Sequence, residues 1–177
     1  MIGKTLVRDT PGGRISGRIV ETEAYPPGDS SGHAFRGETP GNRSLFLERG
    51  YSYVYFTYGS AFMMNVTSES RGIGGGVLIR ALEPLDGVAL MQRWRRTARL
   101  LDLARGPGRL AAAMGIDKRL DGLNLCAKGP LWLGAAVRPT GAIGTSIRIG
   151  ITREVNRERR FFERANPFVS GLKRLNS

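Results

Sequence analysis

The alternating segment from Arg14 to Ala24 is the feature that most constrains how this chain can fold. Its β-branched residues and its period of two predict a strand, in which Ile15, Ile19, Glu21 and Glu23 share one face. The chain also contains 25 glycines, which indicates many tight turns between short elements. The expected framework is therefore a sheet of strands joined by tight turns.

The rest of the pattern is mixed, with strands first and helices inserted late. Further strands are expected at 51–58, 62–67, 76–81, 131–133, 146–152 and 160–163. The first two of these face each other across Gly59-Ser60 as a hairpin. Apolar residues recur every three or four positions over 85–101, which predicts a helix, and a shorter helix over 106–113 is expected to end at Gly115. The pattern predicts an α+β fold: a single domain over 1–177 built on a curved, mostly antiparallel β-sheet with peripheral helices.

The charge balance points to a polyanionic partner. Lys and Arg number 27 against 15 for Asp and Glu, which gives a formal net charge of +12. This excess favours nucleic acid over heparin-like polymers or anionic membrane surfaces. No segment approaches the roughly 18 consecutive apolar residues of a membrane span, and the first residues lack the apolar core of a secretory signal. We expect a cytoplasmic protein without a membrane partner, associated with the nucleoid if the host is a bacterium.

The chain has one cysteine, Cys126, and one histidine, His33. A lone cysteine forms no internal disulfide, so a buried or bystander thiol is expected. Zinc sites that hydrolyse substrates use two or three imidazole or thiolate ligands, and no dense acidic cluster for magnesium is present. We therefore expect neither a metal nor an organic cofactor. His33 stands in a long polar loop, 26–42, where a structural role and a hydrogen-bonding role at a site are both possible.

Glu21 and Glu23 form the one paired-acid feature of the sequence. Two residues apart on a strand, their side chains point the same way, with Cα atoms about 6.6 Å apart. Such a pair is compatible with hydrolysis of a glycosidic bond. It is equally compatible with strand carboxylates that pair with neighbouring arginines in a basic protein. The spacing does not choose between these readings, nor between the two acids.

Two further features fit a nucleic acid partner. The turn Gly106–Arg109 nominally matches a dinucleotide fingerprint but lacks the βαβ frame, so a contact from its backbone amides to a DNA phosphate is the simpler interpretation. Tyr51, Tyr53 and Tyr55 share one strand face, which is commonly a core arrangement. Tyr58 instead lies at the turn, where an aromatic ring can enter a duplex. A wedge on a basic chain suggests base flipping.

Several short motifs follow one another along nearly the whole chain. They are RIVETEAY at 18–25, His33, Thr39-Pro40 with Asn42-Arg43, Tyr53-Val54-Tyr55 through Tyr58-Gly59 to Asn65, LIRALEP at 78–84, Gly106-Pro107 with Arg109-Leu110, Gly129-Pro130-Leu131, and NPFVS at 166–170. In this order they closely resemble the alkyladenine (3-methyladenine, methylpurine) DNA glycosylases. The resemblance implies a base-excision repair enzyme that flips alkylated or deaminated purines out of duplex DNA and hydrolyses the N-glycosidic bond. Its substrates would be of the 3-methyladenine, 7-methylguanine, hypoxanthine and ethenoadenine class.

The same resemblance implies the catalytic roles. Glu23 matches the general base that activates the attacking water, with help from Arg80. Tyr58 matches the wedge that fills the gap left in the duplex. No lysine stands in the matching motifs as an amine nucleophile, so a monofunctional glycosylase without strand-cleaving lyase activity is expected. The implied partner is double-stranded DNA that contains a damaged purine, bound by a monomer.

The remaining implied residues form a base pocket and a DNA-contacting surface. The pocket residues are Tyr25, His33, Tyr55, Asn65 and Leu78. Within this set, Asn65 matches the position that discriminates against the amino group of normal guanine. The DNA contacts are expected at Thr39, Arg43, Gly108 and Arg109.

Two other functions remain open on the residues alone. A non-catalytic nucleic-acid-binding module would have Glu23 in a salt bridge and tyrosines that only stack on bases. A nucleosidase acting on small molecules would also use carboxylates, but it would need neither the charge of +12 nor a wedge. Release of a damaged base from duplex DNA separates the three.

Overall fold

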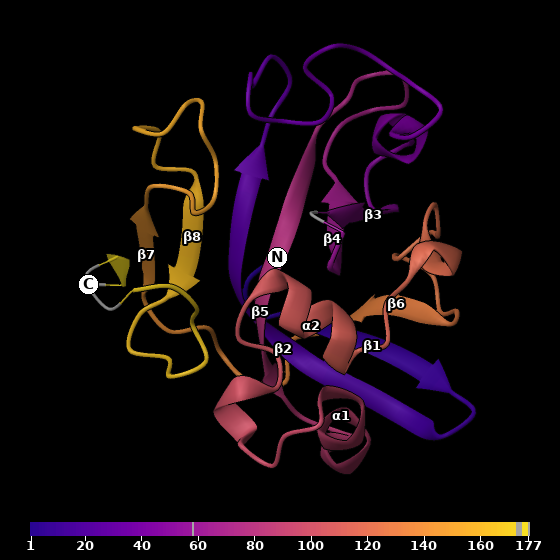
Figure 1. Ribbon diagram of the computed structural model, residues 1–177, viewed down its shortest axis with the longest axis vertical. Coiled ribbons are helices and arrows are strands. Elements are labelled where there is room, and N and C mark those ends of the chain that lie inside the picture. Colours follow the sequence, from indigo (N-terminus) through magenta and orange to yellow (C-terminus); the bar gives the residue numbers. More distant parts are fainter. Residues whose placement is uncertain (58, 173–174, 177) are drawn as a thin grey trace.

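The computed structural model describes residues 1–57, 59–172 and 175–176. Its strands form one antiparallel sheet in the order β3-β4-β5-β2-β1-β6, with β8 paired to β2 and β7 paired to β8 (Figure 1). The strands are β1 (Thr5–Thr10), β2 (Gly13–Tyr25), β3 (Ser52–Thr57), β4 (Ala61–Thr67), β5 (Gly76–Pro84), β6 (Leu131–Gly134), β7 (Ile143–Ser146) and β8 (Arg160–Glu163). The helices are α1 (Val88–Arg95) and α2 (Pro107–Ala113), with 3₁₀ turns at Arg43–Phe46, Leu100–Asp102 and Lys118–Leu120.

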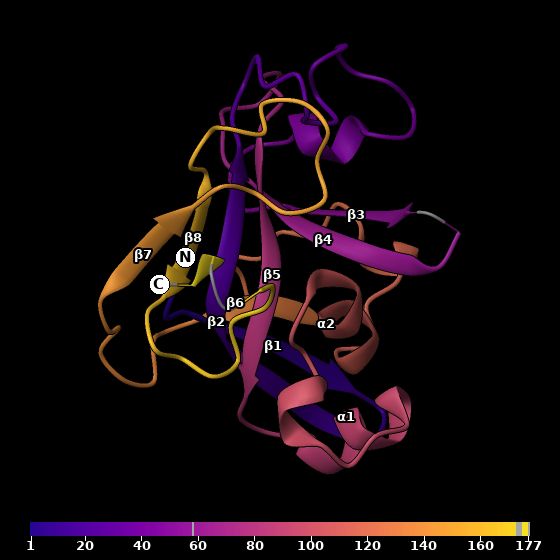
Figure 2. The same cartoon turned by 60° about the vertical axis from the view of Figure 1, so that its left-hand side comes forward.

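The long strand β2 is the spine of the sheet. One of its edges pairs with β5, while its other edge pairs first with β1 and then with β8. The register against β5 shifts on both sides of Glu21, so that Val20 on one strand and Arg80 on the other have no direct partner. Such bulges bend strands and increase their twist. The sheet curls accordingly, and Figure 2 shows it wrapping around the side on which α2 lies.

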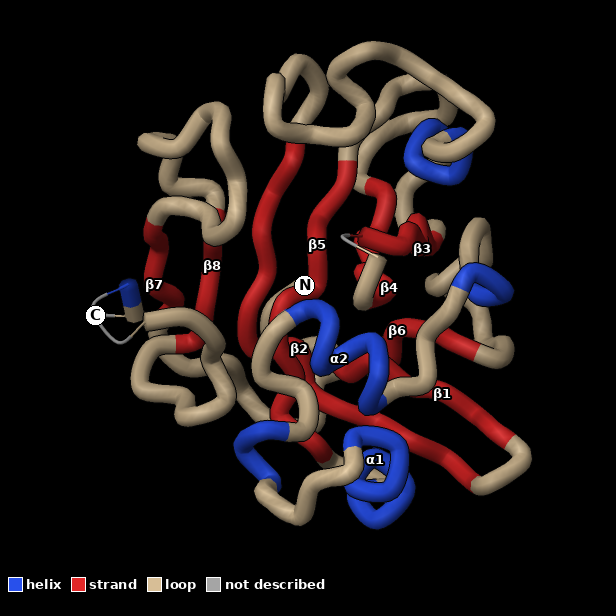
Figure 3. Tube along the Cα trace, viewed as in Figure 1, coloured by secondary structure: helices blue, strands red, loops and turns tan. Residues whose placement is uncertain are grey.

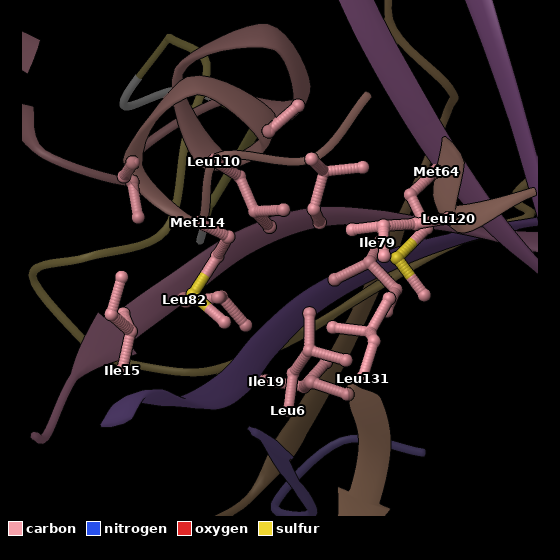
Figure 4. Packing of buried hydrophobic residues seen from close by; sticks show 14 of the residues in the cluster. Leu6, Ile15, Ile19, Met64, Ile79, Leu82, Leu110, Met114, Leu120 and Leu131 are labelled. Atoms are coloured by element: carbon pink, nitrogen blue, oxygen red, sulfur yellow. The ribbon is translucent and has the colours of Figure 1, made fainter. Parts of the chain in front are cut away.

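The main hydrophobic core lies between the curled sheet and α2. Figure 4 shows Leu110 and Met114 directed from the helix region toward Leu82 on β5, and all three side chains are fully buried. Pro107 begins α2, where its missing N–H leaves no intrahelical bond unmade. Gly115, with a φ of 58°, turns the chain away after the helix. Packing in this core therefore holds the start of α2 in a fixed position beside the sheet.

The loops that follow β2 and that join β7 to β8 lie at the same end of the molecule (Figure 3). The loop after β2 covers 26–42, as the sequence predicted. The two loops are tied together by an ion pair between Asp29 and Arg148. Their convergence creates a recess at the end of β2 and β5.

The predicted fold class, α+β with a curved antiparallel sheet and peripheral helices, is confirmed. The β3–β4 hairpin across Gly59-Ser60 is also confirmed, although Tyr51 lies just outside β3, which begins at Ser52. Strand β1 was missed by the sequence analysis. No helix among the described residues is long and apolar enough to cross a bilayer.

Two predicted elements are wrong. The helix expected over 85–101 covers only Val88–Arg95, because Arg96 adopts a left-handed conformation with a φ of 50° and ends it. The strand expected over 146–152 is irregular, and β7 lies before it. In addition, Cys126 is exposed, so the buried alternative for its thiol is wrong and the bystander reading remains.

Candidate active site

A pocket of about 290 Å³ opens where β2, β5, the β3–β4 hairpin and the two loops meet. Its walls come from the end of β2, from both hairpin strands and from the start of α2 at Pro107. The remaining wall is the segment 149–151 between β7 and β8. The pocket is therefore assembled from strands β2, β3, β4 and β5 on one side and from loops and the start of α2 on the other.

Glu23 is fully buried directly behind the pocket lining, where its carboxylate contacts three groups that line the pocket. Its carboxylate accepts the backbone N–H of Ile149 at 2.7 Å and the hydroxyl of Tyr25 at 3.0 Å. The guanidinium of Arg80 approaches the same carboxylate at 3.1 Å. A carboxylate offers about four lone-pair sites, so these three groups orient Glu23 and leave room for one more donor, such as a water molecule. Tyr25, Arg80 and Ile149 all line the pocket.

Glu21 is fully buried and its carboxylate is saturated. It accepts hydrogen bonds from Arg80 at 3.0 Å, from Arg160 at 2.7 Å, and from the Ser170 N–H and hydroxyl at 2.6 and 3.0 Å. Burial alone would raise the pKa of Glu21, but the two guanidiniums and Ser170 outweigh it and hold the pKa below its usual value. Both strand carboxylates are thus salt-bridged, Glu21 to Arg80 and Arg160 and Glu23 to Arg80 alone.

Arg80 connects the two acids. It is the unpaired residue at the β2–β5 bulge, and its side chain reaches both Glu21 and Glu23. A bulge redirects a side chain that regular pairing would aim elsewhere, and bulges are common beside active sites. One guanidinium therefore fixes both carboxylates relative to each other.

Three aromatic rings form one wall of the pocket. The rings of His33 and Tyr55 have centroids 4.3 Å apart, and Tyr53 stacks on Tyr55 at 5.3 Å. A hydrogen bond of 2.8 Å joins His33 Nδ1 to the Tyr53 hydroxyl. Burial of the imidazole lowers the pKa of His33, which favours the neutral ring at pH 7. Since His33 and Tyr55 are in contact, a flat ligand fits beside this wall rather than between them.

Tyr25 stands among charged groups in the same pocket. Its hydroxyl donates to Glu23, and burial together with that carboxylate raises its pKa well above the usual value. The guanidinium of Arg148 lies over its ring, 4.6 Å from the centroid. The ring is therefore held by one contact at its hydroxyl and another on its face.

Asn65 and Leu78 are cross-strand partners of β4 and β5, and both are buried side chains that line the pocket. Of the residues that the resemblance assigned to catalysis and to the base pocket, the structure brings all seven together. They are Glu23, Tyr25, His33, Tyr55, Asn65, Leu78 and Arg80.

The residues expected to contact DNA lie on the outside. Thr39 borders a neighbouring hollow of about 680 Å³ that shares His33 with the pocket. Arg43 is exposed at the start of a 3₁₀ turn. Arg109 is exposed on α2 and pairs with Asp102 at 3.2 Å.

The fourth residue of that set, Gly108, lies on α2 beside the β3–β4 hairpin. Gly108 packs closely against it, since an added Cβ would lie 2.9 Å from the Cβ of Ala61. The expected wedge, Tyr58, lies outside the described residues. Its neighbours Thr57 and Ala61 pair as the last rung of the hairpin.

Asp29, Arg148 and Ile149, which lie in the loops around the pocket, are not among the residues expected from the sequence. Ile149 acts through its backbone N–H, a group that every residue except proline has, so the residue type gives no sign of this role. Arg148 could have been noticed in the sequence, because it is a charged residue between two isoleucines in a segment that is otherwise largely apolar. Asp29 and Arg148 are both fully buried.

The curled antiparallel sheet thus carries an aromatic-walled pocket beside an oriented carboxylate, in a chain with a formal net charge of +12. Sequence comparison then gives the family. A model of the methylpurine-DNA glycosylase family matches residues 1–167, and the chain belongs to this family. It is therefore a hydrolase of N-glycosyl bonds whose substrate is damaged DNA, as the resemblance implied.

Individual relatives agree with this assignment. A protein of Mesorhizobium japonicum is 63% identical over 175 residues, which cover 99% of this chain and 84% of the relative. A protein of Paraburkholderia phytofirmans is 50% identical over 99% of this chain and 82% of its own length. One of Rubrobacter xylanophilus is 46% identical over 86% of this chain and 80% of the relative. All three carry the description "Putative 3-methyladenine DNA glycosylase".

Proposed function

We propose that the chain removes alkylated or deaminated purines from duplex DNA, with Glu23 as the base that activates the attacking water. The observation that carries this proposal is the contrast between the two acids. Glu21 has its hydrogen-bonding sites filled by Arg80, Arg160 and Ser170. Glu23 has three donors, all from groups that line the pocket, and keeps capacity for a water molecule.

The hydrolysis follows from this geometry. The water oxygen bonds to C1′ while Glu23 takes one of its protons, and the bond from C1′ to the purine nitrogen breaks with its electron pair leaving on the base. An alkylated purine that carries a positive charge becomes neutral in this step. A neutral deaminated purine takes up one proton from solvent as it departs. The negative charge of Glu23 also stabilises positive charge that develops on the sugar.

The base would lie between the ring of Tyr25 and the wall formed by His33 and Tyr55. The contact between His33 and Tyr55 supports this placement, because it leaves no space for a ring between those two. A neutral imidazole suits a cationic purine better than a charged one would. Tyr58 would occupy the position that the flipped nucleotide vacates in the duplex.

We assign the selection among purines to two buried residues of the pocket lining, Asn65 and Leu78. Asn65 and Leu78 lie there side by side on neighbouring strands. A side chain held at this place excludes by steric overlap a base whose exocyclic amino group would occupy the same space. Normal guanine is the base that this arrangement would exclude.

Outside the pocket, Thr39, Arg43, Gly108 and Arg109 would bind the DNA backbone and supply the salt-dependent part of the affinity. No lysine lines the pocket among the described residues. An amine that could form a Schiff base with the sugar is thus absent from that wall, which supports a monofunctional glycosylase.

The proposal is tested with duplexes that carry hypoxanthine, 1,N6-ethenoadenine, 7-methylguanine or 3-methyladenine. The wild type should release at least one of these bases and leave alkali-labile abasic sites. Glu23→Gln keeps the side-chain shape but loses the base, so excision should fall about 100- to 10,000-fold. Glu48→Gln, which changes an exposed carboxylate away from the pocket, is the control.

Two outcomes would overturn the proposal. Binding by the wild type without release of any lesion would leave a non-catalytic module. Full activity of Glu23→Gln would remove Glu23 from the chemistry. Thermal unfolding of each variant shows that a loss of activity is not a loss of fold.

A further inference from the structure

We propose that Asp29 and Arg148 are positioning residues, whose buried ion pair sets the place of the Ile149 N–H and the Tyr25 ring around Glu23. The inference rests on the proposed role of Glu23 and extends it to a layer behind the pocket. Neither side chain touches the space that a base would fill. Their effect on the reaction would therefore be exerted through the groups that hold Glu23.

The ion pair is completely enclosed. The side chains of Asp29 and Arg148 have an exposed fraction of 0%, and Nη1 lies 2.5 Å from Oδ2. A second nitrogen of Arg148 reaches the other carboxylate oxygen at 3.3 Å. Arg159 adds a bond of 2.6 Å to the same carboxylate. Buried charges persist only where partners compensate them, so this arrangement holds both loops in one relative position.

Arg148 contacts the pocket on its hidden side. Its Nη1 donates to the carbonyl oxygen of Ala24 at 2.9 Å, and its guanidinium covers the ring of Tyr25. The next residue in the chain, Ile149, gives its N–H to Glu23. The side chain of Arg148 thus fixes the end of β2 and the ring of Tyr25. It also fixes the position of the Ile149 peptide that orients the Glu23 carboxylate.

The backbone of this segment has little other support. Strand β7 ends at Ser146 and β8 begins at Arg160, so no β-ladder holds 147–149. Further ties between these segments come from Arg159, whose side chain bonds Asp29 and whose carbonyl oxygen accepts from the Ala24 N–H, and from a long contact of 3.4 Å between Ser30 and Glu154. Asp29 is itself held in place by its bonds to the N–H and hydroxyl of Ser31.

The test separates positioning from plain stability by using a second buried ion pair as a control. Glu163 pairs with the fully buried Arg18, and neither residue lines the pocket. Asp29→Asn removes the carboxylate that pairs with Arg148, and Glu163→Gln removes the hydrogen-bonded carboxylate of Arg18, which keeps only the more distant Glu83 at 3.9 Å. Both variants should therefore unfold at lower temperature. Single-turnover excision and affinity for the lesion duplex are then measured below both unfolding transitions.

We expect Asp29→Asn to lower the single-turnover rate about 10- to 100-fold, because a displacement of about 1 Å at a catalytic group has effects of this size. Its affinity for the lesion duplex should stay within about threefold of the wild type. Glu163→Gln should keep the wild-type rate despite its lower stability. Equal rates in the two variants would overturn the proposal.

A conservative variant guards against loss of the fold. Arg148→Lys keeps the buried charge balance but cannot form the forked contact with Asp29 or cover Tyr25 in the same way. Its rate should lie between those of the wild type and Arg148→Met, and a wild-type rate in Arg148→Lys and Arg148→Met alike would also overturn the proposal. Glu23→Gln completes the set. If it is inactive while Asp29→Asn is fully active, only this inference fails; if it is active, the proposed function fails.

Discussion

Glu21 and Glu23 are both glutamates, two positions apart on strand β2, but their side chains have different surroundings. Glu21 is buried among Arg80, Arg160 and Ser170, which satisfy it completely. Glu23 shares Arg80 but otherwise contacts groups that border the pocket. Environment rather than residue type therefore separates the structural acid from the candidate base.

The hydroxyl of Tyr25 can be tested apart from its ring. Tyr25→Phe keeps the ring that Arg148 covers but removes the O–H that donates to Glu23. Hydrogen bonds to charged groups contribute about 1.5–3 kcal/mol, so single-turnover excision should fall about 10- to 100-fold with little change in duplex affinity. Tyr51→Phe, which loses a hydroxyl outside the pocket, is the matched control. Similar rates for the two variants would contradict the role given to the Tyr25 hydroxyl.

At this scale the resemblance named the side chains that the structure brings together, but not the backbone N–H that holds Glu23. The motif residues from Glu23 to Arg80 converge on one pocket, as the resemblance implied. Spacing alone did not choose between Glu21 and Glu23, because the choice depends on arginines and a serine from distant segments. The Ile149 N–H was beyond reach, since any residue except proline supplies one.

Among the elements, α2 depends on a single glycine for its exit. Gly115 has a φ of 58°, and an added Cβ would lie 2.5 Å from Trp94 and 2.8 Å from Arg8. Gly115→Ala should therefore lower the free energy of unfolding by about 2–4 kcal/mol, through left-handed strain and overpacking together. Gly72 also has a positive φ of 89° but open space around it.

Urea unfolding of both alanine variants measures the two contributions. Gly72→Ala should lose only the strain of about 1–2 kcal/mol. A loss in Gly115→Ala no larger than in Gly72→Ala would show that the contact with Trp94 is relieved at no cost.

The sequence pattern predicted correctly those strands and turns whose ends are marked by residues within the same segment. The hairpin turns at Gly59-Ser60 and β8 follows its alternation. The helix beyond Arg95 failed because Arg96 takes a left-handed conformation that no periodicity reports. The alternation over 146–152 also misled, because its backbone serves Glu23 and the pocket instead of a neighbouring strand.

For the molecule as a whole, two carboxylates link stability to acid pH. Burial would raise the pKa of Asp29, but Arg148, Ser31 and Arg159 outweigh it and bring it to about 2. The hydrogen bond from Arg18 leads the groups that lower the pKa of Glu163 to about 2. Unfolding returns both groups to ordinary values near 4, so the unfolded chain takes up protons first. Their stabilisation is thus complete above about pH 5 and is lost as the pH falls toward about 2.

Thermal unfolding of the wild type and Glu163→Gln between pH 6 and pH 2 checks this sign. The wild type should unfold at a higher temperature at pH 6, and the difference between the two proteins should shrink as the pH falls. A difference that stays constant over the whole range would show that Glu163 does not titrate with folding.

The pairing of β2 with β8 has a consequence for the order in which the protein is made. Glu21 and Arg160 are 139 positions apart, and Ile149 is 126 positions from Glu23. A nascent chain leaves the ribosome with its early strands long before these partners exist, and long-range pairings form late. The Glu23 carboxylate can therefore gain the Ile149 N–H only after residue 149 has been made, although its partners Tyr25 and Arg80 are present much earlier.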